Sequence, residues 1–169
     1  LPDEQVRQTL HLMQRYHGAA IQQFGDELTL HYHTFAWTNY SGGIPAWVQA
    51  SGFLECRDDF DFTVAQFLLE EGVYPVSFRS GWEWMDNDYQ NHLNLRLPFS
   101  LEANWWPLWI PYHPSPTNCR AAGDGKGWNT RCVYMASISQ AQMNSMFAQA
   151  AAGTDQLACI WAHLPEADF

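Results

Sequence analysis

Two histidines, His31 and His33, stand one residue apart in the segment LTLHYHTF, residues 28–35. The alternating aromatic and β-branched residues of this segment predict a strand, so both imidazoles come near its C-terminal end. Neutral imidazole is a common ligand of zinc and other divalent first-row metals. The pair therefore indicates a metal site. A purely structural alternative stays open, in which His31 points into the sheet and His33 caps a loop.

Other polar residues also follow apolar strands. They are Arg79 in SFRSGW, Glu102 and Asn104 in SLEANWW, and His163 in IWAHLPE. In parallel α/β folds the C-terminal ends of the strands lie on one side, which is the usual place of an active site. We therefore expect these side chains to form one functional site. A buried arginine at a strand end must be paired, so Arg79 implies a carboxylate nearby.

Strands and helices alternate along the chain, which predicts a parallel, helix-covered sheet in an α/β domain. The strands are expected over residues 28–35, 73–82, 97–106, 132–137 and 157–164, and the helices over 2–17, 63–71, 86–95 and 139–152. Gly18 is expected to end the first helix, and Ser139 to cap the last one. Residues 107–131 are rich in proline and are expected to form an irregular loop insertion that folds over the site.

Composition narrows the choice of partner. The chain has 169 residues, 47% of them hydrophobic, enough for one globular domain. Its formal net charge of −10 disfavours nucleic acid and anionic lipid surfaces. No apolar run is long enough to span a membrane. The nine tryptophans point to a neutral partner such as a carbohydrate, because flat aromatic faces stack on sugar rings, although most of them are expected to pack in the core or in loops.

The four cysteines form no C-x-x-C pair, so neither a structural zinc site nor a thioredoxin-like centre is indicated. Cys119 and Cys132 flank the glycine-rich segment AAGDGKG, and either a disulfide or two free thiols would fit there. Cys159 lies in the apolar segment LACIW and is expected to be an inert buried thiol.

Three segments resemble motifs of the polysaccharide deacetylases, the NodB-homology family. GDELTLHYHTF resembles the second motif, which carries the metal-binding histidines, and VSFRSGW resembles the third, whose arginine holds the catalytic base. LACIWAHL resembles the last motif, whose histidine is the general acid. The likeness covers roughly residues 2–166 and points to the divergent branch associated with surface-polysaccharide biosynthesis.

The resemblance implies a distorted (β/α) barrel and a single, partial catalytic domain over residues 1–169. It implies a divalent metal, Zn²⁺ in the first place, on His31 and His33, with Arg79 and His163 as catalytic residues. The residues expected to contact the carbohydrate are Trp82, Trp84, Trp105, Trp109 and Glu102. Phe35 stands where the family has its second histidine, so His33 would replace that ligand.

The family's first motif, with the metal-binding and catalytic aspartates, would lie upstream of Leu1. The first strands of the barrel would then come from sequence outside these residues or from a partner chain. The function implied is metal-dependent hydrolysis of N- or O-acetyl groups on a polysaccharide. Two alternatives stay open: a non-catalytic carbohydrate-binding domain of the same fold, with Trp106 among its stacking residues, and another metal-dependent hydrolase barrel.

Overall fold

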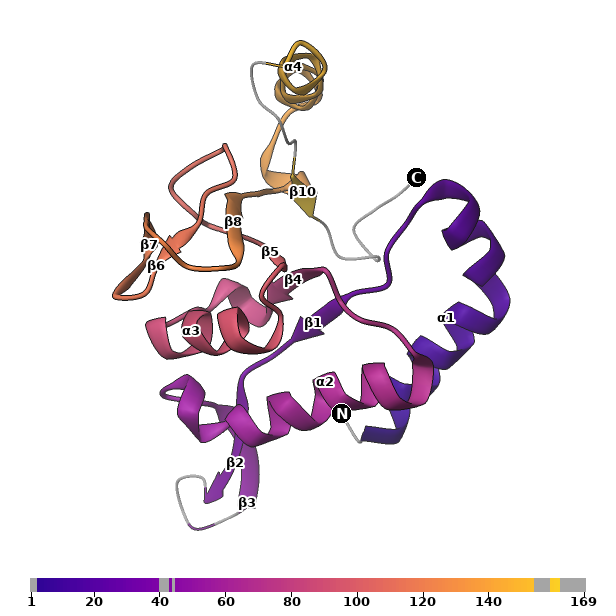
Figure 1. The fold of residues 1–169 in the computed structure, drawn as a ribbon, viewed down its shortest axis with the longest axis vertical. Coiled ribbons are helices and arrows are strands. Elements are labelled where there is room, and N and C mark those ends of the chain that lie inside the picture. Colours follow the sequence, from indigo (N-terminus) through magenta and orange to yellow (C-terminus); the bar gives the residue numbers. More distant parts are fainter. Residues whose placement is uncertain (1–2, 40–42, 44, 154–158, 162–169) are drawn as a thin grey trace.

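A four-stranded parallel sheet forms the centre of the molecule (Figure 1). The computed structural model describes residues 3–39, 43, 45–153 and 159–161. The sheet has the order β1–β4–β5–β8, formed by Leu30–Tyr32, Ser77–Ser80, Leu101–Asn104 and Trp128–Arg131. After β8 the chain continues into β9, Val133–Tyr134, which pairs in parallel with β10, Ile160–Trp161. The predicted parallel α/β organisation is confirmed.

Two helices cover one face of this sheet, α2, Arg57–Glu71, and α3, Asn87–Arg96. The core between them and the sheet is aromatic, and its fully buried members include Phe53, Phe60, Phe78, Tyr89 and Leu93. Phe53 stacks on Tyr89 with ring centroids 4.2 Å apart. His92 on α3 joins the two helices through a 2.7 Å hydrogen bond to Asp61 of α2.

The first helix, α1, covers Asp3–Phe24 and passes through Gly18, so the prediction that Gly18 ends it is wrong. The residues after Gly18 are Ala19, Ala20 and Ile21, which continue a helix at little cost. The stop is Gly25, whose φ of 71° lies in the left-handed region that glycine tolerates. Among the described helices, none is long and apolar enough to cross a membrane.

The last helix, α4, covers Gln140–Ala151 and begins as predicted. Ser139 is its N-cap, and the Ser139 hydroxyl accepts a hydrogen bond from the Gln142 amide, while the Gln142 side chain accepts one from the Ser139 amide. This reciprocal capping box fixes the start of a helix that has no buried residue. The helix therefore depends on its own ends more than on packing.

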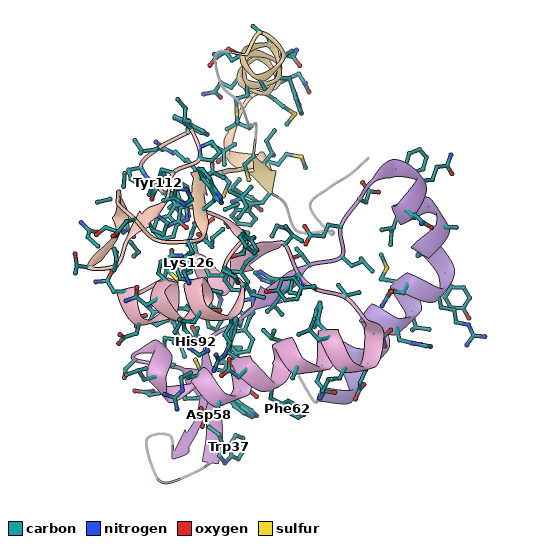
Figure 2. The ribbon with its side chains drawn as sticks, viewed as in Figure 1. Trp37, Asp58, Phe62, His92, Tyr112 and Lys126 are labelled. Atoms are coloured by element: carbon teal, nitrogen blue, oxygen red, sulfur yellow. The ribbon has the colours of Figure 1, made fainter. Side chains whose placement is uncertain are left out.

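Two hairpins lie outside the parallel sheet. In the first, β2, Phe35–Asn39, pairs antiparallel with β3, Pro45–Gln49, and Trp37 lies opposite Trp47. Trp37 projects from this hairpin, away from the body of the molecule (Figure 2). In the second, β6, Pro114–Ser115, pairs with β7, Asn118–Ala122. Neither hairpin was predicted, because their short strands lack a regular apolar alternation.

The predicted irregular insertion over residues 107–131 is partly wrong, since its last four residues are strand β8 of the central sheet. That strand was missed because its buried residues, Asn129 and Thr130, are polar. Asn129 donates to the Gln90 side chain (2.9 Å), and Thr130 donates to the Trp109 carbonyl (3.2 Å). Hydrogen bonding inside the core thus replaces the apolar pattern expected of such a strand.

Candidate functional site

The two histidines meet at the C-terminal end of β1. The Nε2 atoms of His31 and His33 lie 3.0 Å apart, and Nδ1 of His31 lies 3.0 Å from the backbone carbonyl oxygen of Arg79. Because a carbonyl oxygen only accepts, Nδ1 of neutral His31 carries the proton and Nε2 directs its lone pair at His33. The same arrangement orients imidazoles that bind metal ions.

Gly81 makes room for the His33 ring. A Cβ atom on Gly81 would lie 2.3 Å from Cγ of His33, closer than any side chain tolerates. The ring also packs edge-on against Trp82 (centroids 4.6 Å apart) and stacks on Phe35 at 6.0 Å. Phe35 thus supports the ring of the residue expected to be the second metal ligand.

The turn after β4 is held in an unusual conformation. Trp82 and Glu83 both have positive φ angles, 52° and 57°, which residues other than glycine adopt only at a cost of about 1–3 kcal/mol each. An ion pair between Arg79 and Glu83 closes the turn, and Asn104 donates to the Glu83 carbonyl at 3.0 Å. The expected carboxylate partner of Arg79 is therefore Glu83.

The Arg79 guanidinium is held from several sides. Its Nη1 atom donates to the carbonyl of Ala103 at 2.5 Å and to the sulfur of Cys132 at 3.1 Å. The guanidinium also lies over the ring of Trp161, 4.4 Å from its centre. These contacts bring β4, β5 and β10 together beside the histidine pair. His163 lies outside the described residues, two positions beyond Trp161.

Glu102 lies on the other face of the sheet. Glu102 pairs in register with Phe78, whose side chain lies in the core, whereas His31 pairs with Arg79. Successive side chains along a strand point to opposite faces, so Glu102 points away from the histidines. Its carboxyl is fully buried and accepts hydrogen bonds from the Trp106 indole and from Ser80. Burial raises its pKa to about 8, although the Trp106 hydrogen bond opposes that change. Its expected contact with carbohydrate stays a prediction.

The tryptophans expected to bind carbohydrate fall into two groups. Trp82 and Trp105 are exposed, by 53% and 50%, and Trp82 contacts His33. Trp84 is half-buried against the core, and the ring of Trp109 lies under the guanidinium of Arg131, 4.7 Å away. Trp106 is buried, so it is not a stacking surface.

The histidine pair fits two positions of a metal ion's coordination shell. Two ligands of a tetrahedral zinc ion lie about 3.3 Å apart, close to the separation of the Nε2 atoms. Within the part of the chain that the structure describes, no third His, Cys, Asp or Glu joins them. A stable site therefore needs a ligand from elsewhere.

Sequence reasoning missed the residues that shape this site, Gly81 and Glu83. The signal for Glu83 was its position four residues after Arg79, and the signal for Gly81 was its place directly after a strand. Fold and site together define an α/β protein with a histidine pair at the C-terminal edge of a parallel sheet. No family model matches this chain, and no match was found among curated proteins or solved structures.

Proposed function

We propose that the protein is a metal-dependent carbohydrate deacetylase, built on a distorted barrel of the polysaccharide-deacetylase type. The observation that carries the proposal is the convergence of the two Nε2 atoms, with His31 oriented by a backbone carbonyl. The substrate class is a polysaccharide with N- or O-acetyl groups. The acidic composition and the exposed Trp82 beside the pair support a neutral, ring-shaped ligand.

In this proposal His31 and His33 hold a divalent metal, Zn²⁺ in the first place. When bound, the metal would polarise the acyl carbonyl and lower the pKa of a water molecule. Arg79 positions Glu83 and the turn against which His33 packs. His163 gives a proton to the leaving amine or alcohol, in the role of a general acid. The third metal ligand comes from outside the described residues.

A second candidate function is carbohydrate binding without catalysis. It is favoured by the number of protein ligands, because catalytic zinc sites normally have three and the described residues bring together two. Trp82 and Trp105 would then stack on the sugar and supply affinity. In this case sugar affinity depends on the tryptophans and not on the histidines.

Calorimetric titration of Zn²⁺ into the wild type, His31→Ala and His33→Ala tests the metal site. His17→Ala is the matched control, because His17 is an exposed histidine on α1. We expect weak binding by the wild type, loss of that binding in both site variants, and no change in the control. Zinc binding that survives the loss of both His31 and His33 contradicts the metal site.

Acetate release from acetylated oligosaccharides separates the two functions. The enzyme releases acetate in the presence of metal, and His163→Ala slows the release by about 10² to 10⁴ while metal affinity is kept. Sugar binding with no acetate release, unchanged in His31→Ala but lost in Trp82→Ala, supports the binding domain.

A further inference from the structure

Two cysteines far apart in the sequence, Cys132 and Cys159, lie opposite each other directly before two neighbouring strands. Val133 of β9 pairs with Ile160 of β10, and the Val133 amide donates to the Cys159 carbonyl at 3.1 Å. Each cysteine directly precedes one of these partners. Neighbouring strands lie about 4.8 Å apart, within the range of Cα separations that a disulfide bridges.

The two thiols already contact each other. Both are free, and a hydrogen bond joins their side chains. Cys132 is 1% exposed, whereas Cys159 is only partly buried. An incoming reagent therefore meets Cys159 first, and Cys132 stands behind it as the second thiol.

Arg79 supplies positive charge to the pair, since its Nη1 atom lies 3.1 Å from the sulfur of Cys132. The hydrogen bond from Cys132 lowers the pKa of Cys159; burial opposes that change, and the charge of Arg79 adds to it. The same hydrogen bond and burial raise the pKa of Cys132. A partly exposed thiol with a lowered pKa beside a protonated one is the arrangement of a nucleophilic and a resolving cysteine.

The other two cysteines differ. Cys56 is buried, and its thiol donates to the Phe53 carbonyl at 3.3 Å. Burial raises the pKa of Cys56 to about 11 and also raises that of Cys119. Both therefore stay protonated near neutral pH and serve as internal controls for reactivity.

We propose that Cys132 and Cys159 form a reversible redox pair that exchanges with low-molecular-weight disulfides. The Cys159 thiolate attacks one sulfur of the external disulfide, forming a mixed disulfide and releasing one thiolate. Cys132 then attacks the Cys159 sulfur, its proton passes to the second leaving thiolate, and the Cys132–Cys159 disulfide forms. Two electrons pass from the cysteines to the external disulfide, whose two halves leave as one thiolate and one thiol.

Oxidation alters the surroundings of Arg79. In the reduced protein the Cys132 thiol accepts a hydrogen bond from the guanidinium, which also binds Glu83. A disulfide sulfur is a weaker acceptor than a thiol sulfur and is bonded to Cys159. Oxidation of the pair therefore weakens one contact of Arg79 and changes the support of the turn against which His33 packs. The disulfide also closes a loop that contains α4. This inference does not depend on the proposed metal chemistry.

The test treats the reduced, full-length chain with an excess of oxidised glutathione, followed by alkylation of the remaining thiols and mass spectrometry. Trypsin leaves both cysteines in one peptide, because no Lys or Arg follows Arg131, so chymotryptic cleavage after Phe147 is used to separate them. We expect a cross-linked Cys132–Cys159 peptide, alkylated Cys56 and Cys119, and full reversal by a reducing agent. The cross-link should raise the Tm by roughly 5 to 10 °C.

Two variants test the order of attack. Cys132→Ser should accumulate a glutathione adduct on Cys159, because the resolving thiol is missing, whereas Cys159→Ser should form little adduct on buried Cys132. Arg79→Gln should slow alkylation of Cys159 several-fold without changing that of Cys56. Wild-type protein that yields no Cys132–Cys159 cross-link, or only stable glutathione adducts, overturns the proposal whatever the variants do.

Discussion

Glu102 predicts a pH dependence of stability that can be measured directly. Its carboxyl is fully buried on β5, and burial raises its pKa from 4.5 to about 8. Glu102 is therefore mostly protonated in the folded protein near neutral pH, and ionising its buried carboxyl costs free energy. The folded and unfolded pKa values of this carboxyl differ by about 3.5 units. At about 1.36 kcal/mol for each unit, this difference corresponds to about 5 kcal/mol of folding free energy.

The sign of the effect follows from the direction of the pKa change. The full contribution of Glu102 to stability is present below pH 4.5, where the carboxyl is protonated in both states. It decreases as the pH rises and is lost above about pH 8, where folded protein also ionises. At pH 7 roughly two thirds of it, about 3 kcal/mol, has been lost.

Glu102→Gln removes this dependence because the amide cannot ionise. The amide oxygen keeps the hydrogen bond from the Trp106 indole, and the NH₂ group donates to the Ser80 hydroxyl, which lies 3.3 Å from Oε1 of Glu102. The NH₂ group cannot accept from the Ser80 amide as Oε1 does at 3.4 Å, and this loss is the same at every pH. Urea unfolding followed by tryptophan fluorescence, at pH 5, 6, 7 and 8, gives the free energy of unfolding of each form. The free energy of unfolding of the variant should rise relative to that of the wild type by about 1.4 kcal/mol for each pH unit between pH 5 and 8.

The matched control is Asp124→Asn, which removes an exposed carboxylate from the glycine-rich loop. Its stability curve should run parallel to that of the wild type. If the Glu102→Gln curve also runs parallel from pH 5 to 8, then Glu102 is ionised in the folded protein and the reasoning from burial fails.

Three further predictions concern packing and helix ends. Gly81→Ala places a methyl group 2.3 Å from Cγ of His33, so the ring must move and zinc affinity should fall about 10- to 100-fold in calorimetry; Gly18→Ala, whose new methyl group meets no atom within 4 Å, should leave it unchanged. Ser139→Ala removes the capping box of α4 and should cost about 1 kcal/mol, seen as faster hydrogen exchange in that helix alone. Phe53→Ala empties a fully buried site and should lower the free energy of unfolding by about 3–5 kcal/mol in urea titrations.

Each of these has its own contradicting outcome. Unchanged zinc affinity in Gly81→Ala would mean that the His33 ring is free to reorient. Faster exchange throughout the protein in Ser139→Ala would mean that α4 is coupled to the core, against its lack of buried residues. A loss below 1 kcal/mol in Phe53→Ala would mean that the core collapses around the missing ring.

The alternation of strands and helices, the helix after Asp86 and the capped start of α4 could be predicted because local patterns decide them. Asp86 accepts from the Tyr89 amide, Gly72 ends α2 with a φ of 64°, and Ser139 carries a capping box. These signals need only a few neighbouring residues. The meeting of His31 with His33 also follows from a short segment, since both stand at the end of one strand.

What could not be predicted depends on residues that are distant in the sequence. Strand β8 is polar, and its burial makes sense only once Gln90 and Trp109 are known to receive its hydrogen bonds. Cys159, expected to be an inert buried thiol, lies next to Cys132 because of the register between β9 and β10. The sequence left the state of Cys119 and Cys132 open, and both are free thiols.

The spatial order of the central strands has a consequence for how the protein is made. The four strands of the parallel sheet follow one another in space in the same order as in the chain, β1, β4, β5 and β8. The hairpins β2–β3 and β6–β7 lie between them in the chain but outside this sheet. During synthesis, every new strand leaves the ribosome when its partner has already emerged, so the sheet can grow from one edge without waiting for a distant segment. The polar strand β8 then arrives at a site where the acceptor groups of Gln90 and Trp109 are already in the chain.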